Sequence, residues 1–230
     1  MVSEPSGLIT SFERFSALRT LSRTIGAWAL GISLVFIALQ DAVGSDRTIL
    51  VFGDSLSAAL GLRPEQGWVE LLARRLQLQG YGYAVVNASV SGETSSGGLQ
   101  RLPRALELHH PQIVVLELGA NDGLRGLPVE GLRSNLEQMV RISRAAGAHV
   151  LLLGIRIPPN YGPRYGDQFA AVYPAVAEQN RLPLVPFLLH GVALNPELMQ
   201  GDGLHPNAAG EPVVLENVWP QLKPLLKKNL

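Results

Sequence analysis

Short apolar runs alternate with longer amphipathic segments along the chain from residue 47 onward. The apolar runs predict five strands, at residues 48–52, 84–87, 113–118, 150–155 and 184–185. Continuous runs of this kind are typical of strands that are buried on both faces of a sheet. Because the runs alternate with segments of helical spacing, we expect repeated βα units, a parallel sheet of five strands and an α/β fold.

The segments between these strands carry apolar residues that fall on one face of a helix. One stripe contains Trp68, Leu71, Leu72 and Leu76, and a second contains Leu132, Leu136, Met139 and Val140. We expect both stripes to face the core. Further helices are predicted at residues 99–108, 169–178 and 208–226, where internal prolines are expected to kink or shorten them. These prolines are Pro103, Pro174, Pro212 and Pro220.

The first 44 residues have a different pattern. Arg14, Arg19 and Arg23 precede an uncharged apolar stretch at residues 25–39, and Ala42 and Gly44 follow it two positions apart. This layout is typical of a secretory signal, and it predicts cleavage before residue 45. Two alternatives stay open: an uncleaved membrane anchor, which would bring the chain into contact with a membrane, and a buried core helix. We therefore expect a signal peptide or N-terminal anchor at residues 1–44 and one domain at residues 45–230.

Composition narrows the functional classes. The 230 residues carry 19 basic and 19 acidic side chains, so no net field favours binding to nucleic acid. The absence of cysteine excludes a thiol nucleophile, a disulfide framework and a thiolate metal site. No zinc-protease, phosphate-loop or dinucleotide fingerprint occurs in the sequence, and we expect neither a metal nor a cofactor.

Polar or small residues follow three of the predicted strands, where an open parallel sheet places its ligand crevice. Ser55 follows the first strand, and its hydroxyl is a candidate nucleophile. Gly92, in the segment after the second strand, offers a backbone N–H that no side chain shields. Asn121, after the third strand, offers an amide that can donate to a developing oxyanion. Each residue alone is more simply explained, as a helix N-cap, a turn glycine and an Asx-turn respectively.

A carboxylate lies three residues before an imidazole near the C-terminus, at Asp202 and His205. One short loop can therefore orient a general base, which a serine nucleophile requires. A surface turn and a structural histidine are the simpler explanations for this pair when it is taken alone. Together with Ser55, Gly92 and Asn121, however, the pair supplies every role that acyl transfer needs. We interpret the four remaining histidines as structural: His109, His110, His149 and His190.

The blocks GDSLS at residues 53–57, Gly92 with its neighbours, GAND at 119–122 and DGLHP at 202–206 resemble the SGNH (GDSL-type) hydrolase family. The resemblance implies a flavodoxin-like three-layer α/β/α fold, a periplasmic location, and hydrolysis of aryl esters, acyl thioesters and lysophospholipids without a cofactor. It implies that Ser55 is the nucleophile, His205 the base and Asp202 its orienter. It also implies an oxyanion hole formed by the Ser55 N–H, the Gly92 N–H and the Asn121 side chain.

The same resemblance implies that the loop after the asparagine block covers the acyl chain of the substrate. In this sequence that loop consists of Gly123, Leu124, Arg125, Gly126, Leu127 and Pro128. We expect a monomer whose partner is a small-molecule or lipid acyl ester. Two alternatives remain open at this stage: a carbohydrate O-acetylesterase or acyltransferase of the same family, and a lipid-binding module in which Ser55 only caps a helix.

Overall fold

The computed structural model describes residues 47–228. The segment predicted to be a signal peptide or membrane anchor, at residues 1–44, lies outside the described residues, and that assignment stays a prediction. Within residues 47–228, none of the helices combines the length and the apolar character that crossing a bilayer requires.

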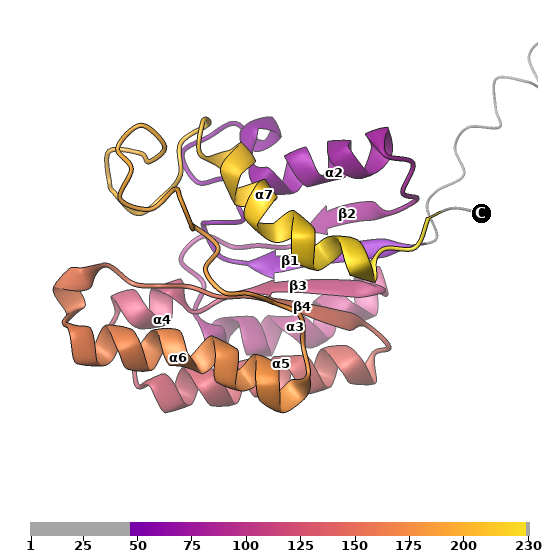
Figure 1. Cartoon of the computed structure of the whole chain (residues 1–230). Coiled ribbons are helices and arrows are strands. Elements are labelled where there is room, and N and C mark those ends of the chain that lie inside the picture. Colours follow the sequence, from indigo (N-terminus) through magenta and orange to yellow (C-terminus); the bar gives the residue numbers. More distant parts are fainter. Residues whose placement is uncertain (1–46, 229–230) are drawn as a thin grey trace, which may run out of the picture. The chain divides into compact units, whose positions relative to one another are not determined.

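A parallel sheet of five strands forms the centre of the described part (Figure 1). Its strands are β1 (Thr48–Gly53), β2 (Ala84–Asn87), β3 (Ile113–Glu117), β4 (His149–Leu153) and β5 (Leu184–Val185), in the order β2-β1-β3-β4-β5. This is the flavodoxin-like order, and the predicted five-stranded parallel sheet is confirmed. The expectation that the strands are buried on both faces is correct for β1 and β3 but wrong for β2, whose ends are exposed because β2 pairs with β1 alone at the edge.

Helices cover both faces of this sheet. The helices α2 (Trp68–Leu78) and α7 (Glu211–Leu222) lie on one face, while α3 (Ser95–His109), α5 (Val129–Ala145) and α6 (Pro163–Asn180) lie on the other (Figure 1). The short helix α4 (Ala120–Leu124) follows β3 directly. The described part also contains three short 3-10 helices: η1 (Pro64–Gln66), η2 (Pro159–Tyr161) and η3 (Lys223–Leu225). The result is the expected three-layer α/β/α arrangement.

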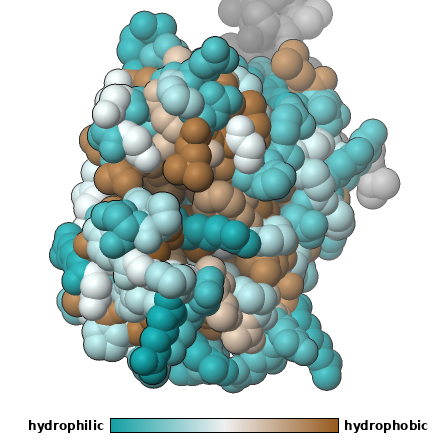
Figure 2. Space-filling view, turned by 60° about the vertical axis from the view of Figure 1, so that its left-hand side comes forward, coloured by the Kyte–Doolittle hydropathy of each residue, from teal (hydrophilic) through white to brown (hydrophobic). Residues whose placement is uncertain are grey.

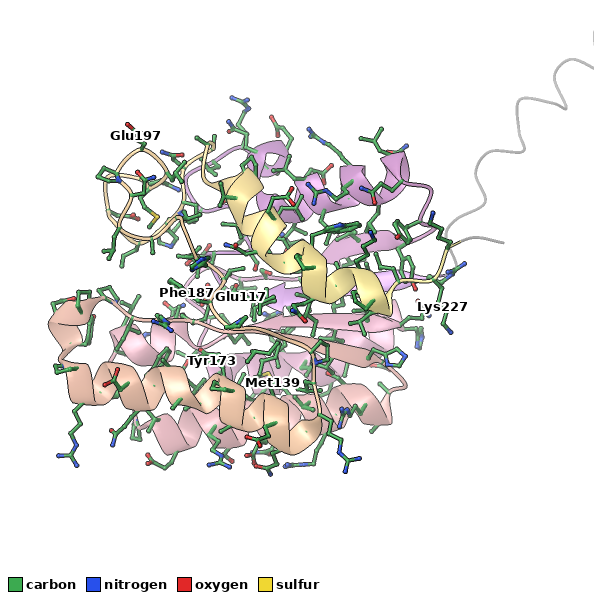
Figure 3. All side chains as sticks on the ribbon, in the orientation of Figure 1. Glu117, Met139, Tyr173, Phe187, Glu197 and Lys227 are labelled. Atoms are coloured by element: carbon green, nitrogen blue, oxygen red, sulfur yellow. The ribbon has the colours of Figure 1, made fainter. Side chains whose placement is uncertain are left out.

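The predicted helical stripes face the sheet. Every residue of the second stripe is buried, and so is every residue of the first except Leu71, which is half-buried. Met139 and Tyr173 point from α5 and α6 into the layer between the helices and the sheet (Figure 3). Removing one large apolar side chain from water contributes about 1.5–3 kcal/mol. Burial of this layer therefore holds the strand ends in fixed positions.

The expectation that prolines shorten the helices is wrong for α3 and α6, which continue through Pro103 and Pro174 and begin four and six residues earlier than predicted. A proline inside a helix costs roughly 3 kcal/mol because it removes a hydrogen bond and crowds the preceding turn. Leu102 on α3 and Tyr173 on α6, next to these prolines, are fully buried. Tertiary packing of this kind offsets the local cost.

Glu211, the first residue of α7, joins the two helices of one layer. Its Oε2 accepts a hydrogen bond of 2.7 Å from the backbone N–H of Trp68, the first residue of α2. The carboxyl group thereby satisfies an N–H that has no partner within its own helix. Burial raises the pKa of Glu211 from the ordinary 4.5 to about 7, although the hydrogen bond from Trp68 acts in the opposite direction.

This raised pKa predicts a pH-dependent stability. The folded protein binds the Glu211 proton more tightly than the unfolded chain, so the contribution of this proton is complete below pH 4.5 and is lost as the pH rises through about 7. In Glu211→Gln the amide oxygen still accepts from Trp68, and no charge has to be buried. We expect Glu211→Gln to have the higher free energy of unfolding at pH 8, by about 1–3 kcal/mol, and to lose this advantage at pH 5.

Urea denaturation at both pH values measures this difference. The exposed first-turn residue of α5 provides the control, because Glu130→Gln removes a carboxylate that is already in water. An advantage of Glu211→Gln that is equal at pH 5 and pH 8 would contradict the titration of Glu211.

Candidate active site

Three segments that carry candidate residues meet at the carboxyl edge of the sheet. Ser55 lies two residues beyond β1, Gly92 lies in the loop after β2, and Asn121 lies in α4 immediately after β3. Because β1 pairs with both β2 and β3, the chain leaves these three strands at neighbouring points. The order of the strands thus explains why residues far apart in the sequence gather at one place.

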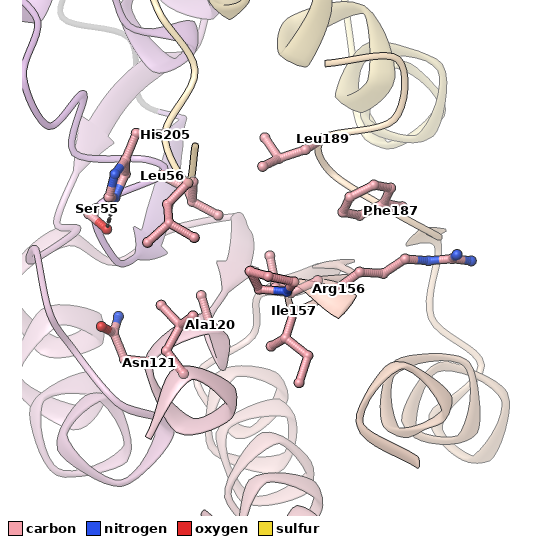
Figure 4. Close-up of a pocket in the computed structure, with 13 residues that line it drawn as sticks. Ser55, Leu56, Ala120, Asn121, Arg156, Ile157, Phe187, Leu189 and His205 are labelled. Carbon is pink, nitrogen blue, oxygen red and sulfur yellow. Dashed lines mark hydrogen bonds between the residues drawn. The ribbon is translucent and has the colours of Figure 1, made fainter. Parts of the chain in front are cut away.

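Ser55, His205 and Asp202 form a continuous hydrogen-bonded chain. His205 Nε2 lies 2.8 Å from Ser55 Oγ (Figure 4), and His205 Nδ1 lies 2.6 Å from Asp202 Oδ2. The two nitrogens of the imidazole therefore face a hydroxyl on one side and a carboxylate on the other. This is the geometry in which a carboxylate fixes the ring and the ring accepts the proton of a serine.

The loop that carries Asp202 and His205 is held by local hydrogen bonds. Asp202 Oδ1 accepts from the backbone N–H groups of Leu204 and His205, at 2.9 and 3.1 Å. Partial burial raises the pKa of Asp202, but the hydrogen bonds from His205 and from these two N–H groups outweigh it and hold the pKa below its ordinary value. Gln200 Nε2 donates to the carbonyl oxygens of Leu60 and Pro206, at 2.7 and 2.8 Å, and so ties this loop to the segment after Ser55.

Ser55 lies in an irregular turn and not at the start of a helix. The backbone N–H of Ala58 donates to the Asp54 carbonyl at 3.0 Å, but the next regular α-helix begins only at Trp68. The simpler explanation of Ser55 as a helix N-cap is therefore not supported. The side chain of Asp54, and not that of Ser55, accepts from the backbone of this turn, at 3.1 Å from the N–H of Leu56.

Two backbone N–H groups beside this turn have no protein partner. Within the described range, neither the N–H of Ser55 nor that of Gly92 donates to another group of the chain. Gly92 has a φ of 81° in a turn closed by a hydrogen bond from Glu93 N to Val90 O, a conformation that favours glycine. Its carbonyl oxygen accepts from Arg125 Nη2 at 2.9 Å. Arg125, from the segment after α4, thus holds the peptide unit that follows Gly92, between Gly92 and Glu93.

Asn121 connects the turn of Ser55 with the loop of Gly92. Its Nδ2 donates to Asp54 Oδ2 at 3.2 Å and to the backbone carbonyl of Glu93 at 3.0 Å. Both amide hydrogens are therefore engaged in this structure. An oxyanion can take one of them only by sharing or replacing one of these bonds, of which the bond to Asp54 is the longer.

Two acidic side chains lie buried beneath the turn of Ser55. Burial raises the pKa of Asp54 to about 6, against the lowering effects of the Leu56 N–H, His205 and Asn121. Burial, reinforced by the charge of Asp54, raises the pKa of Glu117 well above its ordinary value. Glu117 Oε2 accepts from Ser57 Oγ at 2.8 Å and from the Asp54 N–H at 3.2 Å. The buried carboxyl group of Glu117 therefore supports the turn from below.

Gly53 permits this close approach between β1 and β3. A Cβ at residue 53 would collide with the side-chain oxygen Glu117 Oε2 and would lie 2.8 Å from the Glu117 backbone oxygen. A larger residue would push the end of β1, and with it Ser55, away from β3.

An apolar pocket opens beside Ser55 and His205 (Figures 2 and 4). Nearly all of its remaining wall comes from apolar side chains of the segments after β3, β4 and β5. The lining residues are Leu56, Ala120, Asn121, Leu124, Ile155, Arg156, Ile157, Pro158, Phe187, Leu189 and Leu204. Figure 2 shows the hydrophobic surface of this hollow on the face that carries the carboxyl ends of the strands. Among residues 47–228, no three His, Asp or Glu side chains are grouped as a metal site.

Comparison with known proteins assigns the family. Residues 51–211 match the model of the GDSL-like Lipase/Acylhydrolase family. The chain belongs to this family. Esterase TesA of Pseudomonas aeruginosa is 56% identical over 195 residues, which cover 85% of this chain and 96% of that protein. Thioesterase 1/protease 1/lysophospholipase L1 of Escherichia coli K12 is 41% identical over 202 residues, covering 88% and 95% respectively.

A crystal structure of TesA superimposes with a TM-score of 0.77 at 59% identity and covers 78% of this chain and 100% of that chain. The SGNH resemblance drawn from the four sequence blocks is therefore confirmed, and so is the fold. As a member of the GDSL-like lipase/acylhydrolase family, the chain is a serine esterase that hydrolyses carboxylic esters of small acyl substrates.

The structure brings some of the predicted site residues together and leaves others outside the pocket lining. Ser55, Asp202 and His205 are in direct contact, and Asn121 and Gly92 lie on the loops beside them. Of the predicted acyl-covering loop, only Leu124 lines the pocket. Gly123 is buried behind the pocket wall, where a Cβ would lie 2.8 Å from Phe169, and Arg125, Gly126, Leu127 and Pro128 are exposed outside the lining. α4 ends at Leu124, and the predicted role of this loop in covering an acyl chain stays a prediction.

The sequence motifs did not indicate most of the residues that line the pocket. Ile155, Ile157 and Phe187 follow the fourth and fifth strands and carry no catalytic motif. The signal that would have found them is their position, because apolar residues directly after a strand lie at the carboxyl edge, where ligands bind.

The buried contacts of Glu117 lead to a prediction. Glu117→Gln keeps an acceptor for Ser57 and for the Asp54 N–H, whereas Glu117→Leu leaves both donors without a partner. An unsatisfied buried donor costs about 1–3 kcal/mol, so we expect the leucine variant to lose roughly 2–5 kcal/mol of unfolding free energy and the glutamine variant much less. Denaturant titration of the two variants and the parent measures this. Equal stability of the two variants would show that these hydrogen bonds do not support the turn.

Proposed function

We propose that the family's ester hydrolysis proceeds in this chain through an acyl-enzyme on Ser55, with His205 as general base and Asp202 as its orienter. The single observation that carries the proposal is the continuous Ser55–His205–Asp202 chain, with contacts of 2.8 and 2.6 Å. In the first step His205 Nε2 takes the proton of Ser55 Oγ while Oγ attacks the ester carbonyl carbon. The C–O or C–S bond to the leaving group then breaks as His205 returns the proton to that group.

Deacylation repeats the sequence with water. His205 Nε2 takes a proton from a water molecule, whose oxygen attacks the acyl carbon, and the proton passes to Ser55 Oγ when the acyl–serine bond breaks. Asp202 stabilises the imidazolium formed in both halves and keeps Nδ1 protonated. Apart from the ester, the reaction consumes only water, so it requires no cofactor.

The negative charge of each tetrahedral intermediate needs donors. In this proposal the donors are the N–H groups of Ser55 and Gly92, which have no partner within residues 47–228, and the amide of Asn121. The bond from Asn121 to Asp54, at 3.2 Å, is the one that gives way to the oxyanion. Donors already fixed by the loops stabilise the transition state without reorganisation.

The substrate class in this proposal is an acyl ester or thioester with an apolar chain, including aryl esters and lysophospholipids. The apolar lining of the pocket supports it, since nine of its residues are Leu, Ile, Ala, Pro or Phe. A carbohydrate O-acetylesterase would need more polar groups in the wall than Asn121 and Arg156 provide. The names of the relatives, which include esterase, thioesterase and lysophospholipase, agree with this class.

We also propose that the enzyme acts in the periplasm. The support comes from the arginines and the apolar stretch before residue 45, which have the layout of a secretory signal.

A series of p-nitrophenyl esters from acetyl to palmitoyl tests the nucleophile and the substrate class together. We expect Ser55→Ala to lose turnover of every ester while it keeps the circular dichroism spectrum of the parent. For the parent we expect chains longer than acetyl to give the higher kcat/KM, because each methylene buried in the pocket contributes about 0.8 kcal/mol. Ser57→Ala is the matched control in the same turn. Turnover that survives in Ser55→Ala would refute the nucleophile, and a preference for acetyl would favour the sugar-ester alternative.

Removal of the Asn121 amide tests the oxyanion hole. Loss of one oxyanion donor typically lowers kcat by about 10²–10³-fold, so we expect Asn121→Ala to fall in this range with a small change in KM. Because Asn121 also links Asp54 and Glu93, the melting temperature is measured beside the rate. Asn135→Ala, which removes a comparable bond to Ser95 Oγ away from the pocket, is the control. A kcat near that of the parent would remove Asn121 from the mechanism.

A further inference from the structure

One polar side chain of the pocket has no role in the proposed chemistry. Ser55, Asn121 and His205 act on the reacting ester, and nine other lining residues are apolar. Arg156 is the remaining lining residue, and it brings a permanent positive charge to an otherwise apolar wall. The question is which part of a substrate this charge meets.

The backbone places Arg156 at the opposite end of the pocket from the catalytic residues. The segment after β4 is fixed to the segment after β5, because Gly154 N donates to Val185 O and Leu188 N donates to Gly154 O, each at 2.8 Å. Figure 4 shows Ser55 and His205 at one end of the pocket and Arg156 with Phe187 at the other. A substrate that reaches Arg156 must therefore extend away from its scissile bond.

The guanidinium of Arg156 lies over an aromatic ring. Its Cζ is 5.5 Å from the centroid of the Phe187 ring, a cation–π distance. Such a contact contributes about 0.5–1 kcal/mol at an exposed site. It orients the arginine stem along the wall and leaves the N–H donors for another partner.

No acidic group of the described chain neutralises this arginine. Within residues 47–228 the Arg156 side chain forms neither an ion pair nor a hydrogen bond, although Asp167 lines a neighbouring hollow together with it. Two other arginines near the site are engaged: Arg101 pairs with Glu93 at 2.7 Å, and Arg125 binds the Gly92 carbonyl. Arg156 thus differs from both, because its exposed side chain has no hydrogen-bond or ion-pair partner among residues 47–228.

We propose that Arg156 is a specificity-determining residue that binds an anionic group of the substrate, a phosphate or a carboxylate, while the apolar wall holds the hydrocarbon between this group and the ester. The proposal rests on the proposed function of the Ser55 site. A guanidinium presents paired N–H donors that match two oxygens of either anion. The anion can belong to the leaving group, as in a lysophospholipid, or to the far end of the acyl chain, as in a monoester of a dicarboxylic acid.

Two matched substrate pairs test the proposal and distinguish these sources. The first pair is octanoyl glycerol phosphate and octanoyl glycerol, which differ in a phosphate on the leaving group. The second is the p-nitrophenyl monoester of octanedioic acid and p-nitrophenyl octanoate, which differ in a carboxylate at the end of the acyl chain. All four esters are assayed below the concentrations at which they form micelles, with the parent, Arg156→Gln and Arg156→Lys.

We expect Arg156→Gln to lower kcat/KM for the anionic member of at least one pair by roughly three- to tenfold more than for its neutral partner, the effect of one partly exposed ion pair. Arg156→Lys should keep part of the preference, because it retains the charge without the paired donors. The parent's preference should also weaken between about 0.1 and 1 M salt, as the screening length falls from ~10 to ~3 Å. The pair that responds identifies the source of the anion.

Arg104→Gln serves as the control, because Arg104 is a highly exposed arginine of α3 that pairs with Glu107. An equal loss on neutral and anionic esters in Arg156→Gln would overturn the proposal and limit Arg156 to packing on Phe187. Unchanged ratios in both pairs would overturn it as well. Neither result would affect the nucleophile, whose failure would appear separately as turnover of the neutral esters by Ser55→Ala.

Discussion

The contact of 2.8 Å between Ser55 Oγ and His205 Nε2 joins two segments that are 150 residues apart in the sequence, and the rest of the site depends on it. On one side, β1 runs through the centre of the sheet and delivers Ser55 to its carboxyl edge. On the other side, the loop before α7 returns His205 to the same edge. Gln200 fixes this return through its bonds to Leu60 and Pro206, so the distance is set by the fold on both sides.

Two buried acidic groups support the turn that carries Ser55. The turn after β1 has no regular helix to satisfy its backbone, and the carboxyl groups of Asp54 and Glu117 accept from its N–H groups instead. Two carboxylates cannot both be ionised so close together in a buried position. Burial raises the pKa of both groups, that of Glu117 well above its ordinary value and that of Asp54 to about 6, while the Leu56 N–H, His205 and Asn121 act in the opposite direction on Asp54.

The sequence was sufficient for the architecture and for the residues that form the catalytic chain. The predicted run at residues 113–118 is apolar except for Glu117 and is followed directly by GAND, so both the strand and the asparagine after it are recognisable. The pocket wall was not predictable in this way, because Ile157 and Phe187 join one wall only when the segments after β4 and β5 pack together. Glu117 belongs to the predicted third strand, but its raised pKa depends on burial and on Asp54, a residue 63 positions away that approaches only in the folded sheet.

Local rules also gave errors that tertiary packing explains. Pro103 and Pro174 oppose helix formation, yet the buried faces of α3 and α6 outweigh their effect. Ser55 has the features of an N-cap, yet the capping acceptor in the structure is Asp54. The predicted acyl-covering loop contributes Leu124 alone to the lining, whereas Arg125 from the same loop holds the carbonyl of Gly92. The packing that outweighs the prolines involves segments distant in the sequence, whereas the contact of Asp54 with Leu56 is local.

The measurement that tests the central claim most directly is covalent labelling with a phosphonate ester that mimics the tetrahedral intermediate, followed by intact mass spectrometry and peptide mapping. The account predicts one adduct per chain, located on Ser55, with activity lost in proportion to labelling and no adduct in His205→Ala on the same timescale. An adduct on another residue, or full esterase activity in a protein labelled at Ser55, would contradict the account.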